Sequence, residues 1–372
     1  LGYCRHGVVM TTALVFVAIL FSAVMVHELA HYLNARSVGV PVRAFSIGFG
    51  PVLWRRTWRG TEWRLSAIPL GGYVDLPGMV AEEDEHGRLR HPSGGMAEKP
   101  LAAKLWVLVG GVIANFVLGT LLLTGAVLLE PGYRALTTGV APEVQGTVVV
   151  QVVEGSLAEQ AGLRAGDRIV AAGGVQDPAP DATVAAIRDA QGTLTLRYAR
   201  EGEERTLSLP WPPADVPEGE RPLLGVQLGP AVVASVGPGA ALAESAAFAV
   251  RAVPEMVAGF VRGFGSVLSG RPSEEVAGPV GMVGLVSDAT RIGLAPVLVL
   301  AAIINFSLAV FNLLPIPGLD GGRMLLSTVV AIRGRPFRPG QEEAFHFIGI
   351  LAVLALIVLI TLQELQGVVA AG

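Results

Sequence analysis

Cysteine and charge are both scarce in this chain of 372 residues. The single cysteine, Cys4, excludes a disulfide framework and any zinc site built from cysteine thiolates. Only 16% of the residues are charged, whereas about a quarter are charged in an average soluble domain. The net charge of −4 is small, so the chain lacks the basic balance of a nucleic-acid-binding protein and we expect no nucleic-acid partner.

Apolar residues are abundant instead. They make up 52% of the chain, and its mean hydropathy of +0.56 is typical of a membrane protein. A helix needs about 20 predominantly apolar residues to cross the hydrocarbon core of a bilayer. Four stretches meet this requirement, and we predict membrane-spanning helices within residues 8–36, 101–129, 294–326 and 345–362. The predicted fold class is therefore a mainly α-helical membrane protein with four transmembrane helices, and the lipid bilayer is an expected partner.

The basic residues of the connecting segments predict how the chain is oriented. Ten of them lie between Arg36 and Lys104, and four more follow the third span, from Arg323 to Arg338. Cytoplasmic loops carry such an excess of arginine and lysine. We therefore expect a multi-pass protein of the cell (inner) membrane. Residues 75–100 would form a cytoplasmic loop, while residues 131–293 and both termini would be extracytoplasmic.

The most informative motif is His27-Glu28-Leu29-Ala30-His31, at the end of the first apolar stretch. Residues four apart lie on one face of a helix, so His27 and His31 can present two imidazoles to one metal ion. Glu28 can reach a water molecule on that metal. The motif alone is moderately specific, but its place at the cytoplasmic end of a membrane helix points to a protease that cuts inside or beside the bilayer.

A catalytic zinc site takes three protein ligands and one water, so a third ligand is required. Our candidate is Asp320, in Leu319-Asp320-Gly321-Gly322 at the cytoplasmic end of the third span. An ionisable group at membrane depth is costly unless it faces a partner or water. A role in the turn would explain an aspartate before two glycines equally well if the motif stood alone. The matching depth of the two histidines favours the ligand.

These residues predict the chemistry of peptide hydrolysis. Zn²⁺ brings the pKa of a bound water to about 7. Glu28 would act as the general base and return the proton to the leaving amine. Asn312, near the end of the third span, is expected to contact the substrate backbone or the developing oxyanion. A hydrogen bond between helices would explain Asn312 nearly as well.

Residues 42–74 predict strands in hairpins, because short alternating runs are broken by Gly and Pro. Aromatic residues beside arginines are typical of the membrane interface, but an ordinary cytoplasmic hairpin has equal weight. A transmembrane substrate hides its peptide bonds in helical hydrogen bonds, so it must be unwound before cleavage. An exposed strand edge in this segment could hold the substrate extended, with Gly71 and Gly72 as the expected contacts.

Residues 146–230 predict a compact extracytoplasmic α+β module inserted between the second and third spans, since strand-like runs alternate with Gly-rich turns. Residues 240–270 predict a helix. This helix either lies along the membrane surface or packs on the spans, and both interpretations remain open.

Together these motifs resemble the site-2 protease family of intramembrane zinc metalloproteases, in particular the bacterial branch that carries PDZ domains. The resemblance implies that His27, His31 and Asp320 bind Zn²⁺, that Glu28 is the catalytic base and that Asn312 contacts substrate. Residues 42–74 look like the membrane-associated β-loop of that family. The resemblance covers most of the chain, and it rests on residues 27–31, 48–51, 69–74, 110–119 with Asn115, 278–281 and 312–322.

The same resemblance implies that residues 146–230 are a circularly permuted PDZ domain, with Gly225 and Val226 in a loop that binds the C-terminal carboxylate of a peptide. The best-known relatives carry two PDZ domains in tandem, whereas this chain has room for one. The implied function is regulated intramembrane proteolysis. Its substrates would be single-span transmembrane proteins already trimmed outside the membrane, such as anti-sigma factors, or remnant signal peptides.

Two other classes of protein were weighed against the protease. A metal transporter needs several ionisable groups along a path through the spans, and only one such cluster is present. An inactive membrane scaffold that merely carries a PDZ domain leaves the intact Glu28 and the distant Asp320 unexplained.

Overall fold

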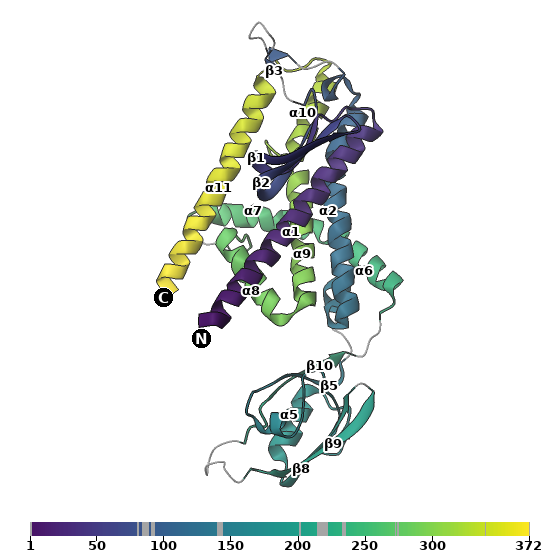
Figure 1. The fold of residues 1–372 in the computed structure, drawn as a ribbon, viewed down its shortest axis with the longest axis vertical. Coiled ribbons are helices and arrows are strands. Elements are labelled where there is room, and N and C mark those ends of the chain that lie inside the picture. The colour runs from purple at the N-terminus through teal and green to yellow at the C-terminus, as the bar shows by residue number, and fades with distance from the viewer. Residues whose placement is uncertain are drawn as a thin grey trace. The chain divides into compact units, whose positions relative to one another are not determined.

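The computed structural model describes residues 2–79, 82–83, 89–90, 94–139, 144–200, 202–213, 222–232, 236–271, 273, 275–338 and 340–371. These residues form two compact units. One consists of Leu1–Leu129 together with Pro238–Gly372, and the other is Glu130–Gly237. The first unit is dominated by helices, and the second is built around a β-sheet (Figure 1).

Four helices among the described residues are long and apolar enough to cross a membrane. They are α1 (Gly2–Ser37), α2 (Leu101–Leu129), α9 (Leu294–Leu313) and α11 (Gln341–Ala371), one in each of the four apolar stretches. Helix α9 is the central one, since 56% of its apolar window is buried against 11% for α11. The expectation of a mainly helical chain with four candidate spans is therefore confirmed.

Four shorter helices complete the first unit: α6 (Pro238–Arg251), α7 (Val253–Leu268), α8 (Pro279–Ile292) and α10 (Asp320–Arg333). The single helix expected over residues 240–270 is instead two, because the chain breaks at Ala252 and Pro254 suits only the first turn of a new helix. The third span likewise stops at Leu313, before Pro315 and Pro317, and the chain becomes helical again at Asp320.

Glycines on α2 allow its neighbours to approach closely. A Cβ atom built on Gly119 would lie 2.6 Å from the ring of Phe306 on α9. One built on Gly110 would lie 2.5 Å from the amide nitrogen of Asn34 on α1, which donates a hydrogen bond to the carbonyl of Trp106. Small residues at helix contacts in membranes serve this purpose, and here they draw α1 and α9 towards opposite sides of one helix.

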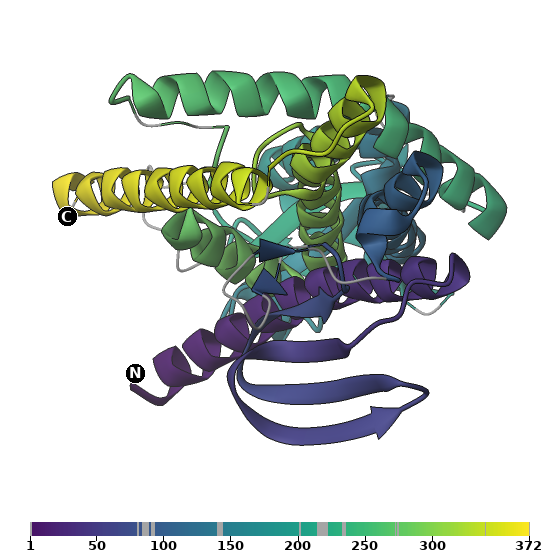
Figure 2. The ribbon, with the colours of Figure 1, turned by 90° about the horizontal axis from the view of Figure 1, so that it is seen from above.

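Strands β1 (Ala44–Trp58) and β2 (Thr61–Asp75) form an antiparallel sheet after α1. Both strands bend, so that residues 44–47 lie between the two halves of β2 and pair with each. The free edges of this sheet are therefore residues 52–58 on one side and residues 72–75 on the other. Figure 2 shows the sheet beside α1, with its hairpin reaching away from the helices.

Short elements join these parts. Strand β3 (Glu82–Glu83) pairs with β4 (Leu89–Arg90), and two 3-10 turns lie at Met96–Glu98 and Pro131–Tyr133, the second of which leads into α3 (Arg134–Thr138). Much of the predicted cytoplasmic loop 75–100 lies outside the described residues.

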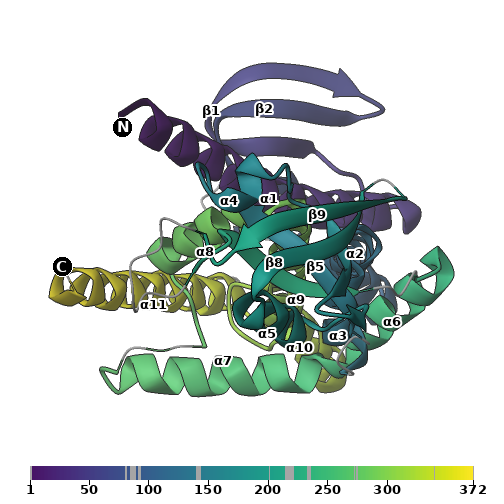
Figure 3. The same ribbon diagram turned by 90° about the horizontal axis from the view of Figure 1, so that it is seen from below.

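The second unit is a sheet with the strand order β10-β5-β6-β8-β9, to which β7 is added by pairing with β6. One longer helix, α5, lies against this sheet (Figure 3). A core that includes Ile169, Leu194 and Trp211 joins the helix and the sheet. The elements are β5 (Val144–Val152), α4 (Leu157–Gln160), β6 (Arg168–Ala172), β7 (Val175–Gln176), α5 (Pro180–Asp189), β8 (Gly192–Arg200), β9 (Glu203–Trp211) and β10 (Val226–Val232).

Candidate metal centre

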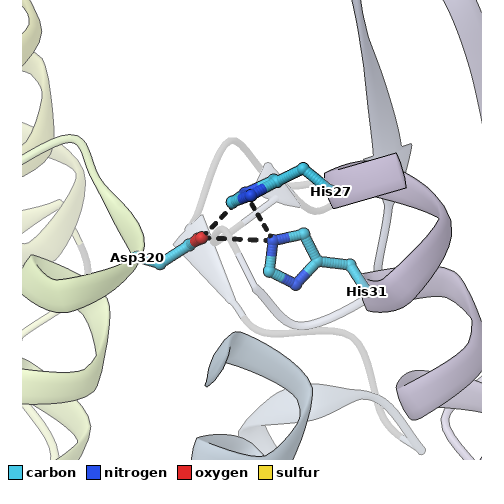
Figure 4. Close-up of side chains that lie close together, drawn as sticks. All are labelled: His27, His31 and Asp320. Atoms are coloured by element: carbon cyan, nitrogen blue, oxygen red, sulfur yellow. Dashed lines mark hydrogen bonds and ion pairs between the residues drawn. The ribbon is translucent and has the colours of Figure 1, made fainter. Parts of the chain in front are cut away.

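Three side chains from two distant parts of the chain converge in the first unit. His27 and His31 lie one turn apart on α1, and Asp320 is the first residue of α10 (Figure 4). The Nε2 atoms of the two histidines are 3.1 Å apart, and they lie 3.0 and 3.2 Å from Oδ2 of Asp320. Among the described residues this is the group of His, Cys, Asp and Glu side chains whose geometry could hold a metal ion.

The hydrogen bond of His31 fixes which of its nitrogens faces the centre. Its Nδ1 lies 2.8 Å from the carbonyl oxygen of Val107 on α2, and a carbonyl can only accept, so Nδ1 carries the proton. The neutral ring then turns a bare lone pair of Nε2 towards His27 and Asp320. A carboxylate oxygen and an unprotonated nitrogen repel each other unless a cation lies between them.

The spacing of the three atoms fits that cation. Zinc binds nitrogen and oxygen at about 2.0–2.2 Å, so two ligand atoms of a tetrahedral site are roughly 3.3 Å apart. The observed separations of 3.0–3.2 Å are close to this value. Two imidazoles and one carboxylate are also a ligand set found in catalytic zinc sites, where the fourth position stays open for water. The residues present therefore fit Zn²⁺.

Helix α2 contacts the side chains of both histidines. Besides the carbonyl of Val107, it supplies Gly111, where a Cβ atom would lie 2.6 Å from both ring nitrogens of His27. Only a glycine leaves room for the imidazole at this position. Both contacts come from a helix that carries none of the three converging side chains, so the HExxH motif gives no sign of them.

The turn before α10 aims Asp320 at the histidines. Gly321 and Gly322 lie so close to the carbonyls of Leu314 and Ile316 that a side chain on either would collide with the backbone. The N–H of Gly318 donates to Nδ1 of His346 on α11 at 2.9 Å.

Glu28 lies beside the converging side chains, and its carboxylate accepts a hydrogen bond from the backbone N–H of Val74 in β2. A cavity of about 250 Å³ opens at this point, and Asn312 lines it together with Glu28. The other lining residues are His27, His31, Tyr73, Val74, Leu76, Met79, Gly318, Leu319, Asp320 and Arg323. The structure therefore brings five of the predicted site residues to one cavity.

The other four predicted contacts lie elsewhere. Gly71 and Gly72 are in β2 but do not line the cavity. Their local packing accounts for them, because Gly71 has a positive φ of 109° and a Cβ on Gly72 would lie 2.5 Å from the carbonyl oxygen of Ser46. Gly225 and Val226 belong to the second unit.

Sequence reasoning did not single out Tyr73, Val74 and Arg323 as neighbours of the three converging side chains. Arg323 follows Asp320 by one helical turn, and this spacing was its only signal. Burial lowers the pKa of its guanidinium, whereas the charge of Asp320 opposes that shift. An arginine remains protonated in such a setting, so the cavity contains one fixed positive charge.

Comparison with known proteins shows to which family the chain belongs. The sequence model of Peptidase family M50 matches residues 15–356. The chain belongs to Peptidase family M50, the site-2 proteases. A candidate zinc metalloprotease of Agrobacterium fabrum is 33% identical, and the match covers 95% of each chain.

Other relatives are also named as metalloproteases. The zinc metalloprotease RasP of Shouchella clausii is 26% identical over 96% of this chain and 99% of its own length. A chloroplast membrane metalloprotease of Arabidopsis thaliana, ARASP, is 28% identical over 91% of this chain and 75% of its own. This M50 member is therefore a zinc-dependent metalloprotease, and its four apolar helices make it a membrane protein.

Proposed function

We propose that this M50 metalloprotease hydrolyses peptide bonds within the membrane-spanning segments of single-span proteins. The observation that carries the proposal is the position of His27, Glu28 and His31 inside the apolar helix Met10–Ser37, with Asp320 directly opposite. A water-soluble substrate has no reason to reach a cavity between membrane helices. A substrate that already lies in the bilayer can approach it from the side.

In this proposal His27, His31 and Asp320 hold the zinc ion. When bound there, zinc acts as a Lewis acid that polarises the scissile carbonyl and acidifies a water molecule. Glu28 takes the proton of the attacking water and delivers it to the leaving nitrogen. The hydrogen bond from the Val74 N–H holds the Glu28 carboxylate in place.

One free edge of the β1–β2 sheet is the proposed binding site for the substrate. Residues 72–75 form that edge, and Tyr73 and Val74 also line the cavity. An extended peptide could add to this edge as a further strand, which would expose its carbonyls beside the metal. Asn312 also lines the cavity, and its side-chain amide would donate a hydrogen bond to a substrate carbonyl.

We further infer that the second unit is a PDZ domain that binds the C-terminus of a peptide. Its strand β10 ends the sheet, and a bound peptide would extend the sheet at that edge. The loop before β10 is held in shape by Gly225, whose φ is 81° and whose carbonyl accepts from the N–H of Val153. This arrangement supports a carboxylate site at Gly225 and Val226.

The proposed biological setting is regulated intramembrane proteolysis in the cell (inner) membrane. The metal centre would lie near the cytoplasmic side and the second unit outside the cytoplasm, as the basic residues of the loops indicate. The substrates would be anti-sigma-factor-like proteins already trimmed outside the membrane, or remnant signal peptides.

The test uses the full chain in lipid vesicles with a single-span model substrate that has a short outer segment. Mass spectrometry of the fragments should place the new termini inside the apolar segment. Glu28→Gln should reduce cleavage at least a thousandfold while the zinc content stays unchanged, because this variant loses the base and keeps the ligands. New termini found only outside the apolar segment, or undiminished cleavage by the variant, would refute the proposal.

A further inference from the structure

One segment of the β1–β2 sheet is exposed along its whole length. Every residue from 51 to 60 is exposed, and we name this segment the hairpin arm. Its large apolar side chains are well exposed: the values are 68% for Leu53 and 53% each for Trp54 and Trp58. Two tryptophans and a leucine in such a setting indicate a surface that something else covers.

The hairpin arm also carries three arginines, Arg55, Arg56 and Arg59. Among the described residues none of the three has an acidic partner. The nearest carboxylate along the strands, Glu62, is occupied by Arg64 at 2.7 Å. In addition Arg55 pairs in register with Arg64, and like charges directly opposite each other weaken a sheet. The arm therefore lacks anions, and its partner should supply them.

The tip of the arm is tied to the end of the first span. Arg59 and Gly60 form a two-residue turn between the paired residues Trp58 and Thr61, and both have positive φ angles, 51° and 78°. The guanidinium of Arg36, the last basic residue of α1, donates to the carbonyl of Arg59 at 2.8 Å. The arm is thus held at the level where the apolar helix ends, which is the level of the lipid headgroups.

The composition of the arm matches that level. Indole rings settle at the membrane interface, and arginines bind the phosphates of anionic lipids. Arg59 also stacks on the Trp58 ring at 4.7 Å, which places a cation and an indole side by side. Side chains alternate between the two faces of a strand, and both faces of the arm are exposed. A protein partner would cover one face, whereas a headgroup layer surrounds both.

We propose that the hairpin arm is a docking site for anionic phospholipid, in which Arg55, Arg56 and Arg59 bind headgroup phosphates and Trp54 and Trp58 rest at the interface. The arm belongs to the same sheet as residues 72–75, which reach Glu28 through Val74. Anionic lipid bound at the arm therefore sets the depth of the edge strand beside the metal centre.

The experiment places the full chain in nanodiscs of phosphatidylcholine that contain a minor share of brominated lipid. The brominated lipid is either phosphatidylglycerol, which is anionic, or phosphatidylcholine in equal amount. Bromine quenches nearby indoles, and the difference between wild type and the double variant Trp54→Phe/Trp58→Phe isolates the signal of the arm. We expect brominated phosphatidylglycerol to quench this signal about twice as strongly as brominated phosphatidylcholine, because the arginines enrich anionic lipid around the arm.

Substitutions of the three arginines test whether their positive charge causes the preference for anionic lipid. Replacing Arg55, Arg56 and Arg59 with glutamine should abolish the preference, and replacing them with lysine should keep most of it. The matched control replaces Arg333, Arg335 and Arg338 with glutamine, which removes the same charge elsewhere and should leave the preference intact. Equal quenching by the two brominated lipids would overturn the proposal. So would an arm that no lipid quenches because a second copy of the chain covers it in a stable dimer.

Discussion

At the candidate metal centre, the position of the proton on the His31 ring determines whether His27, His31 and Asp320 can bind one metal ion. The carbonyl of Val107 holds that proton on Nδ1 of His31, which leaves Nε2 free as a ligand. Asp320 contributes the negative charge, and His27 the second nitrogen. Removing the carboxylate should therefore weaken metal binding without disturbing α1.

Asp320→Asn is predicted to lower zinc retention at least tenfold, because a neutral amide is a poorer ligand than a carboxylate. Competition with a chelator followed by metal analysis of the purified protein measures this loss. Glu28→Gln serves as the control, since Glu28 is not among the converging ligand atoms. Equal zinc stoichiometry and equal chelator resistance in Asp320→Asn and wild type would remove Asp320 from the metal site.

A second buried carboxylate, Asp167, stabilises the second unit and has no part in the candidate metal centre. Its side chain is 1% exposed, and Nε and Nη2 of Arg200 both donate to it at 2.7 Å. Burial acts to raise the pKa of Asp167, but the hydrogen bonds from Arg200 and from the N–H of Arg164 outweigh it, so the pKa is lowered. The pair therefore stabilises the fold above the ordinary pKa of aspartate.

The stabilisation that the Asp167–Arg200 pair contributes should be lost at acidic pH. Because the folded-state pKa is depressed, the stabilisation is complete above about pH 4 and is lost as the pH falls further. Amide hydrogen exchange of residues 144–200 in the full chain should show faster opening over that range. Asp167→Asn should be less stable by about 2 kcal/mol near neutral pH, since it removes the buried charge that accepts two hydrogen bonds from Arg200. Asp189, which is exposed, provides the control substitution Asp189→Asn.

The candidate metal ligands could be proposed from the sequence because their spacing and depth can be read from it. The spacing of four residues from His27 to His31 places both on one helix face, and Asp320 was predicted from its position just after another span, at the same depth. The contacts of Gly111 and of the Val107 carbonyl could not be predicted. Neither a glycine in an apolar helix nor a backbone oxygen indicates, in the sequence, which side chain it will contact. The expected contacts at Gly71 and Gly72 remain predictions, although packing against Phe49 and Ser46 explains both residues.

Among the elements, α2 illustrates how a helix without catalytic side chains shapes the site. Its glycines face α1 at Gly110 and Gly111 and α9 at Gly119. Hydrophobic patterns predicted the four spans, because length and apolarity suffice for that. They did not predict the break at Ala252 or the bent strands of the β1–β2 sheet. A helix break and a change of strand partner depend on tertiary packing as much as on local sequence.

Gly111→Ala is predicted to weaken zinc binding tenfold or more, because the added methyl group displaces the His27 ring. Alanine is the better helix former by about 1 kcal/mol, so helix propensity cannot cause the loss. Gly125→Ala on the same helix is the matched control, since its Cβ would lie 3.5 Å from Leu298, an ordinary contact. Equal zinc affinity in the two variants would contradict the role assigned to Gly111.

At the scale of the whole molecule, the distribution of arginine and lysine predicts that residues 131–293 lie outside the cytoplasm and the loop after α10 lies inside. The scarcity of cysteine makes this testable. In a Cys4→Ser background, Gln160→Cys in the second unit should react with a membrane-impermeant maleimide on spheroplasts. Arg335→Cys should react only after permeabilisation. Both positions are exposed, so the membrane alone decides which one reacts. Labelling of Arg335→Cys in intact spheroplasts would reverse the proposed topology.

The last candidate span is physically linked to Asp320, the third candidate metal ligand. The N–H of Gly318 is bound to His346, and Gly349 packs directly on Pro317, so the turn that presents Asp320 rests on α11. The C-terminal half of α11 is anchored as well, because the carboxylate of Glu364 accepts from the N–H groups of Gly278, Val280 and Gly281 at the start of α8. A sideways movement of the N-terminal half of α11 would pull the aspartate away from the two imidazoles. Zinc affinity could then report on a movement of α11 that begins at the lipid-facing side of the protein.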